Sequence, residues 1–142
     1  MSARAAFLRG INVGGHHKLP MAELRAMLKS LRYGDVATYI QSGNAVFNSD
    51  KQPDILETEI KHAIGNAFPF SADVRVLTLS ALTQIIDGNP FPDAARDPQM
   101  LHVWLLEEPA GEADIGKLSA LATGRERFEL KCRAAYLHAP DG

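Results

Sequence analysis

The chain has 142 residues, of which 46% are hydrophobic and 23% are charged. This composition excludes wholesale disorder and fits one ordinary domain or two very small ones. The formal net charge of −2 gives no long-range attraction for nucleic acid or anionic lipid. The single cysteine, Cys132, cannot form an internal disulfide, and no apolar run approaches the roughly 20 residues of a membrane helix. We therefore expect a soluble cytoplasmic protein that does not enter a membrane.

The first half of the sequence alternates strand-like and helix-like segments. Residues 5–13 form an apolar strand, and residues 36–41 and 45–48 flank a Ser42-Gly43-Asn44 turn that is typical of a hairpin. Apolar residues at three- and four-residue spacing predict helices that begin near Pro20 and Pro53, and we expect Gly34 to stop the first of them. A fourth strand covers 74–78. The order is βαββαβ, which is the ferredoxin-like arrangement of four antiparallel strands with both helices on one face.

The second half repeats the start of this pattern and then stops. A short helix is predicted over 80–87, followed by a Pro-rich connector. Strands are predicted near 101–106, 128–133 and 135–139, with a helix near 115–121. We therefore predict an α+β chain with a complete ferredoxin-like half at 1–79, a connector at 80–98 and an incomplete second ferredoxin-like half at 99–142.

Three strings in the first half carry a family resemblance. They are LRGINVGG (8–15), PMAELRAML (20–28) and YIQSGNAVF (39–47). Together they resemble the bacterial domain of unknown function family 1697, closely over residues 4–49 and by element order from there to 142. The resemblance implies tandem ferredoxin-like halves and no established activity. Members usually continue for some tens of residues, with a Ser-Lys element and an Arg-Asn-Trp-Asn-Thr-like stretch, so we expect this chain to be a truncated or short form.

The predicted topology brings two glycine-containing segments together. Strands one and two are parallel with strand three between them, so the loop 10–19 and the turn 41–44 should lie at one end of the sheet. Such a loop beside a helix start favours anions. The predicted ligand-binding residues are Arg9, Gly10, Asn12, Gly14, Gly15, Lys18, Gln41, Ser42 and Asn44. The alternative is that the glycines shape two corners of the fold and the polar side chains cap them.

Catalytic, metal and cofactor chemistry find little support in the sequence. Gly10 and Gly15 have the spacing of a phosphate loop, but His16 and His17 stand where Lys and Ser/Thr are needed. Adjacent histidines without a nearby cysteine or carboxylate cluster do not suggest a metal site. Cys132 with His138 across the hairpin is a weak nucleophile pair, and Cys132 alternates with Phe128 and Leu130, which suits a core residue better. We therefore expect a non-enzymatic protein with no catalytic residues and no cofactor.

Two other classes of function stay open. RNA binding would need exposed aromatic residues on the central strands, where the sequence offers only Phe7 and Phe47, so the sequence argues against it. Homodimerisation follows from the incomplete second half, because the strand at 101–106 would lack a neighbour on one side. Either a second copy of the chain or the helix at 80–87 would then cover that edge.

Overall fold

The computed structural model describes residues 1–40, 42–92, 101–105, 127–131 and 134–138. The chain is α+β and divides into two compact units, Met1–Thr83 and Gln84–Gly142. This division falls inside a helix, and the finer boundaries predicted at 79 and 98 stay predictions. No helix in the described ranges is long and apolar enough to cross a membrane.

The first unit has the predicted element order. Its elements are β1 (Ser2–Arg9), α1 (Met21–Ser30), β2 (Gly34–Tyr39), β3 (Asn44–Ser49), α2 (Pro53–Ala67) and β4 (Asp73–Thr78). The strands form one antiparallel sheet in the order β2-β3-β1-β4. Because β3 lies between β1 and β2, those two strands run parallel, as the sequence predicted.

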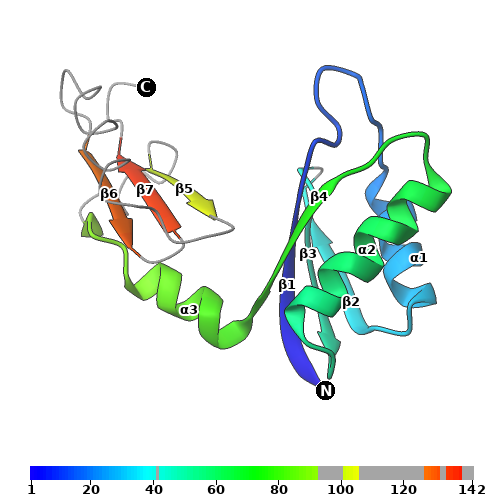
Figure 1. Cartoon of the computed structure of the whole chain (residues 1–142), viewed down its shortest axis with the longest axis horizontal. Helices are drawn as coiled ribbons and strands as arrows, with labels where there is room; N and C mark the ends of the chain where they lie inside the picture. The colour runs from blue at the N-terminus through cyan, green and yellow to red at the C-terminus, as the bar shows by residue number, and fades with distance from the viewer. Residues whose placement is uncertain (41, 93–100, 106–126, 132–133, 139–142) are drawn as a thin grey trace. The chain divides into compact units, whose positions relative to one another are not determined.

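The core of this unit lies between the sheet and its two helices, which cover the same face (Figure 1). Leu24 and Leu28 of α1 and Leu56, Ile60 and Ile64 of α2 are at most 1% exposed. They pack with buried residues from one face of the sheet, namely Ala6, Leu8, Ala45, Phe47 and Val76. Burial of each large apolar side chain contributes roughly 1.5–3 kcal/mol to the free energy of unfolding. The three-and-four spacing of the apolar residues therefore placed both helices correctly.

The end of α1 differs from the expectation that Gly34 would stop it. Arg32 takes the left-handed conformation with φ 67, and its N–H bonds to the Lys29 carbonyl at 2.9 Å. The Tyr33 N–H bonds to the Leu28 carbonyl at 3.3 Å. These two bonds form a Schellman motif, which usually places glycine where Arg32 stands. Gly34 is instead the first residue of β2.

The second unit contains a smaller antiparallel sheet. The helix α3 (Leu79–Asp87) leads towards it, and β5 (Leu101–Leu105), β6 (Arg127–Lys131) and β7 (Ala134–His138) form the order β5-β7-β6 (Figure 1). Tyr136 is 2% exposed, packs with Phe91 and Ala134, and donates a 2.6 Å hydrogen bond to the Ile85 carbonyl. The predicted helix at 115–121 and most of the Pro-rich connector lie outside the described residues.

Candidate functional site

The loop after β1 and the turn before β3 lie side by side. The Leu8 N–H donates a 2.8 Å hydrogen bond to the Gly43 carbonyl, and Arg9 is paired in register with Asp73 at the start of β4. Gly43 has φ 94, and a Cβ there would approach the Leu8 Cβ to 2.9 Å. The predicted neighbourhood of the two glycine-containing segments is therefore confirmed, and at Gly43 only glycine fits without strain.

Asn12 holds the loop closed rather than pointing into open space. Its side-chain amide donates to the Leu19 carbonyl at 2.9 Å, and its Oδ1 accepts from the Leu19 N–H at 2.7 Å. Between them, Val13 and His16 form a short antiparallel bridge across Gly14 and Gly15, whose φ values are 58 and 77. Positive φ at both central positions is what a type I′ turn requires. These three predicted ligand residues thus have structural roles in the loop.

His17 adds an aromatic contact that the sequence did not predict. Its ring stacks on Phe70 with centroids 4.8 Å apart, and its Nδ1 lies 2.9 Å from the Gly10 carbonyl oxygen. A carbonyl oxygen only accepts, so Nδ1 carries the proton in this contact. His17 also has φ 53, in the left-handed region. The loop is therefore anchored through the backbone of one predicted residue, Gly10.

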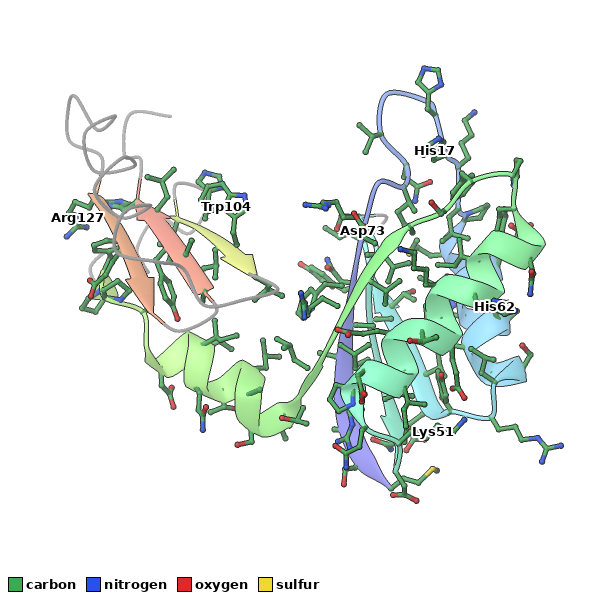
Figure 2. All side chains as sticks on the ribbon, viewed as in Figure 1. His17, Lys51, His62, Asp73, Trp104 and Arg127 are labelled. Atoms are coloured by element: carbon green, nitrogen blue, oxygen red, sulfur yellow. The ribbon has the colours of Figure 1, made fainter. Side chains whose placement is uncertain are left out.

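The cationic side of the site contains an acidic residue that sequence reasoning missed. Arg9 donates to Asp73 Oδ2 from Nη2 at 2.6 Å and from Nε at 3.1 Å, and the Lys61 Nζ lies 3.9 Å from Asp73 Oδ1. The hydrogen bond from Arg9 lowers the pKa of Asp73. A signal was available, because the predicted topology places the start of the fourth strand beside the end of the first. Figure 2 labels Asp73 at this position and His17 on the loop.

The remaining predicted residues are spread along the same end of the sheet. The Asn44 amide donates to the Ser42 hydroxyl at 2.9 Å, which holds the turn. Lys18 is exposed, and no hydrogen bond or ion pair joins its side chain to another described residue. Gln41 lies outside the described residues. Its neighbour Ile40 has φ 48 and is 60% exposed, which is an unusual conformation for a β-branched residue.

The structure also bears on the metal-binding, RNA-binding and nucleophile candidates. In the described ranges, no group of three His, Cys, Asp or Glu side chains is arranged to hold a metal ion. Phe47 is 2% exposed and stacks on Tyr33 with centroids 4.5 Å apart, so it is not available to stack on RNA bases. Cys132 lies outside the described residues. Its suggested partner His138 is 9% exposed and lies 2.7 Å from Arg127 Nη2. Because arginine only donates, His138 Nδ1 accepts this bond.

A second candidate site is the outer edge of β5. Within the described residues β5 pairs only with β7, in an unbroken register from Leu101↔His138 to Leu105↔Ala134. Its sequence LHVWL contains no Lys, Arg, Asp, Glu, Gly or Pro. Val103 is 42% exposed and Trp104 is 49% exposed, with the Trp104 ring 6.0 Å from that of His102. Such an uncharged edge strand readily pairs with another strand.

The other edge strands carry features that hinder such pairing. In β2 the register shifts between Gly34 and Ala37, and Asp35 within this irregular segment has φ 47. In β4 the outward N–H of Val76 is taken by Glu57 Oε2 at 2.9 Å. Charged residues occupy alternate positions of β6, at Arg127, Glu129 and Lys131. Bulges, charges and covering side chains are the usual protections of a sheet edge, and β5 has none of them among the described residues.

Comparisons with known proteins place the chain in a family and a fold. The model of a family described as "Protein of unknown function (DUF1697)" matches residues 1–136. The chain is also similar in structure to the conserved bacterial protein SP0830 from Streptococcus pneumoniae. The TM-score is 0.76 at 26% sequence identity, over 99% of this chain and 78% of that one. A search of curated proteins gave no match.

Proposed function

We propose that this chain, which belongs to the DUF1697 family, is an association module that forms a homodimer through the outer edge of β5. The observation that carries the proposal is the contrast between β5 and the other edge strands. Natural sheets protect their edges, so an uncharged and regular edge with half-exposed Val103 and Trp104 suits a strand that takes a partner.

The chemistry of β5 favours a polypeptide strand over a small molecule. A strand edge offers alternating N–H and C=O groups, which another strand satisfies with main-chain hydrogen bonds. The half-exposed side chains beside it add apolar contact area. A second copy is the simplest partner because it presents the same uncharged edge, and self-complementary pairing of this kind gives a two-fold symmetric dimer.

Sedimentation equilibrium of the purified chain and of Val103→Lys tests the proposal. We expect the wild type to sediment with twice the monomer mass and Val103→Lys as a monomer with an unchanged circular dichroism spectrum, because an edge lysine opposes strand addition. Val46→Lys is the matched control, since Val46 lies in mid-strand in β3 and is 53% exposed. A monomeric wild type overturns the proposal.

A second measurement separates a partner strand from the chain's own continuation. The same sedimentation run includes a version extended by the C-terminal elements that family members carry. We expect the extended version to dimerise with the same Val103→Lys sensitivity. A dimer that is lost on extension overturns the homodimer proposal, because the continuation then takes up the edge itself.

A small-anion site at the 9–18 and 41–44 end of the first sheet is the second candidate. Two observations favour it. Asp73 is shared by Arg9 and Lys61, so two cations face one carboxylate, and Lys18 on the loop before α1 is exposed. Exposed Ile40 also keeps a strained conformation beside Gln41, and backbone strain of this kind clusters at functional sites. In this proposal Arg9 and Lys18 bind the anion, and Gln41, Ser42 and Asn44 orient it.

Titration with inorganic phosphate, followed by amide NMR shifts, tests this second candidate. We expect saturable shifts of the Gly10, Gly14 and Gly43 amides that are lost in the Arg9→Ala/Lys18→Ala variant. Lys29→Ala removes an exposed cation from the end of α1 and is the matched control. Shifts that are equal in both variants, or no shifts at all, contradict an anion site at this end of the sheet.

A further inference from the structure

Three aromatic rings form a stack beside the loop that follows β1. The centroids of the Phe68 and Phe70 rings lie 5.4 Å apart, and the His17 ring lies on Phe70 at 4.8 Å with an interplanar angle of 10°. Phe68 and Phe70 are half-buried and pack against the core of the first unit, whereas His17 is exposed. The stack therefore begins at the core and ends with the imidazole ring of His17.

The His17 ring is held in a fixed orientation. Phe70 covers one of its faces, and its Nδ1 donates to the Gly10 carbonyl at 2.9 Å. The exposed surface of this side chain therefore consists of the second ring face and the remaining ring edge. A ring whose orientation is already fixed loses little conformational entropy when another ring stacks on it. The second face of His17 thus offers a surface for one planar group.

Positive charge lies next to both points that anchor this ring. Lys18 follows His17 directly in the chain, and Arg9 directly precedes Gly10, whose carbonyl holds the ring. Consecutive Cα atoms are about 3.8 Å apart, so each cationic side chain begins one residue from an anchor point. Lys18 and Arg9 are both exposed. An aromatic surface therefore occurs together with cations of the kind that bind phosphate.

Resting on the anion site that is the second candidate function, we infer that the anion is a nucleoside monophosphate. Its base stacks on the free face of His17, and its phosphate binds Lys18 and Arg9. Arg9 already bonds to Asp73, and Lys61 Nζ, 3.9 Å from Asp73 Oδ1, offsets part of the negative charge there. Stacking on an aromatic side chain accepts every base, so this surface selects the class of ligand and not the base.

A single nucleotide suits this surface better than a nucleic-acid strand. Proteins that bind single strands present several aromatic side chains, on which successive bases stack. Here the three rings stack on one another, and of the three only His17 is exposed. The stack thus accommodates one base. The formal net charge of −2 also gives no long-range attraction for a polyanion.

Separate NMR titrations with inorganic phosphate, AMP and adenosine test the inference. We expect AMP to bind at least about tenfold more tightly than phosphate, because stacking of the base adds to the contacts of the phosphate. Adenine should also shift the ring-proton resonances of His17 upfield, which phosphate should not do. At saturating AMP, His17 resonances without such a shift overturn the stacked base, and this result needs no variant.

His17→Asn removes the ring and is suited to keep the loop. Asparagine tolerates the left-handed conformation of His17, φ 53, and its amide can donate to the Gly10 carbonyl. The Leu19 amide resonance, which reports the bond to Asn12, checks that the loop is intact. We expect the AMP affinity of this variant to fall to that of phosphate. His16→Asn, at the neighbouring exposed histidine, is the matched control and should bind AMP as the wild type does.

The outcomes separate the nucleotide from the anion site on which it rests. Equal affinities for AMP and phosphate in the wild type overturn the stacked base and leave the anion site in place. Amide shifts with neither compound overturn both. Adenosine that binds as tightly as AMP overturns the inference, because the phosphate then contributes nothing at Lys18 and Arg9.

Discussion

The Tyr33 hydroxyl donates a 2.7 Å hydrogen bond to Oε2 of Glu59, which joins the segment before β2 to α2. Tyr33 is 6% exposed, and its ring stacks on Phe47 in the core of the first unit. Burial, together with the hydrogen bond to Glu59, raises the pKa of Tyr33. Hydrogen bonds from Lys51 and then from Tyr33 lower the pKa of Glu59. The pair is therefore held as a neutral phenol facing a carboxylate.

This pair predicts a loss of stability in alkali. In the unfolded chain Tyr33 ionises near pH 10, whereas its raised pKa in the fold keeps it protonated there. The stabilisation is thus present below about pH 10 and is lost as the pH rises towards the folded pKa. In Tyr33→Phe the urea concentration at the unfolding midpoint should fall less steeply with pH above pH 10 than in wild type. Tyr39→Phe, at a 72% exposed position, should keep the wild-type pH dependence. An equal alkaline loss in both variants contradicts the prediction.

Gly43→Ala should destabilise the first unit by about 2 kcal/mol or more, because both the backbone and the space around it oppose a side chain. Gly43 has φ 94, and an added Cβ would also lie 3.0 Å from Ile11 Cδ1 and 3.2 Å from the Leu8 carbonyl oxygen. Gly65 in α2 is the matched control, since nothing lies within 4 Å of an added Cβ there. Gly65→Ala should stabilise by about 0.5–1 kcal/mol. Urea unfolding of both variants checks the contrast.

Asn12→Ala should cost about 1–3 kcal/mol, because it leaves the Leu19 N–H and C=O without the partners that the Asn12 amide provides. Native-state hydrogen exchange should show the Leu19 amide opening faster by a corresponding factor. Asn66→Ala, at an exposed position of α2, should change stability by less than about 0.5 kcal/mol. An Asn12→Ala chain as stable as wild type contradicts this structural role of Asn12.

Ile40→Asn should stabilise the chain by about 1 kcal/mol, because asparagine tolerates the left-handed conformation that isoleucine resists. The 60% exposed Ile40 side chain gives up little buried area in exchange. If Ile40 is strained for the sake of the anion site, the same variant should weaken the phosphate-induced amide shifts. Thermal unfolding measures the first effect, and a melting temperature below that of wild type contradicts it.

The chain order of elements was predictable because it depends on local periodicity. The three-and-four spacing of Leu24 and Leu28 marked α1, and Pro53 marked the start of α2. The prediction went wrong at the end of α1, where glycine was expected to stop the helix. Arg32 takes the left-handed conformation that ends the helix, which a non-glycine residue resists. The next residue, Tyr33, packs in the core with Phe47.

The sequence predicted where the candidate ligand site lies in the fold. It did not predict which side chains at that site are already bonded to other parts of the chain. Strand order put the two glycine-containing segments at one end of the sheet. Whether Asn12 and Arg9 meet a ligand or their own chain depends on side-chain directions, and these follow from how the loop folds back onto Leu19 and Asp73. Asp73 was missed although the predicted topology placed the start of β4 beside the end of β1, because Arg9 and Asp73 lie 64 residues apart in the sequence and no short motif joins them.

By itself, the sequence determined the α+β class, the βαββαβ order of the first unit and the family, since these follow from short-range patterns and motifs. The tertiary structure decided which polar groups are already bonded, at Asn12 and Arg9, and which strand edge, that of β5, carries no protection from the described residues. These properties depend on contacts between residues far apart in the chain, which hydrophobic periodicity does not encode.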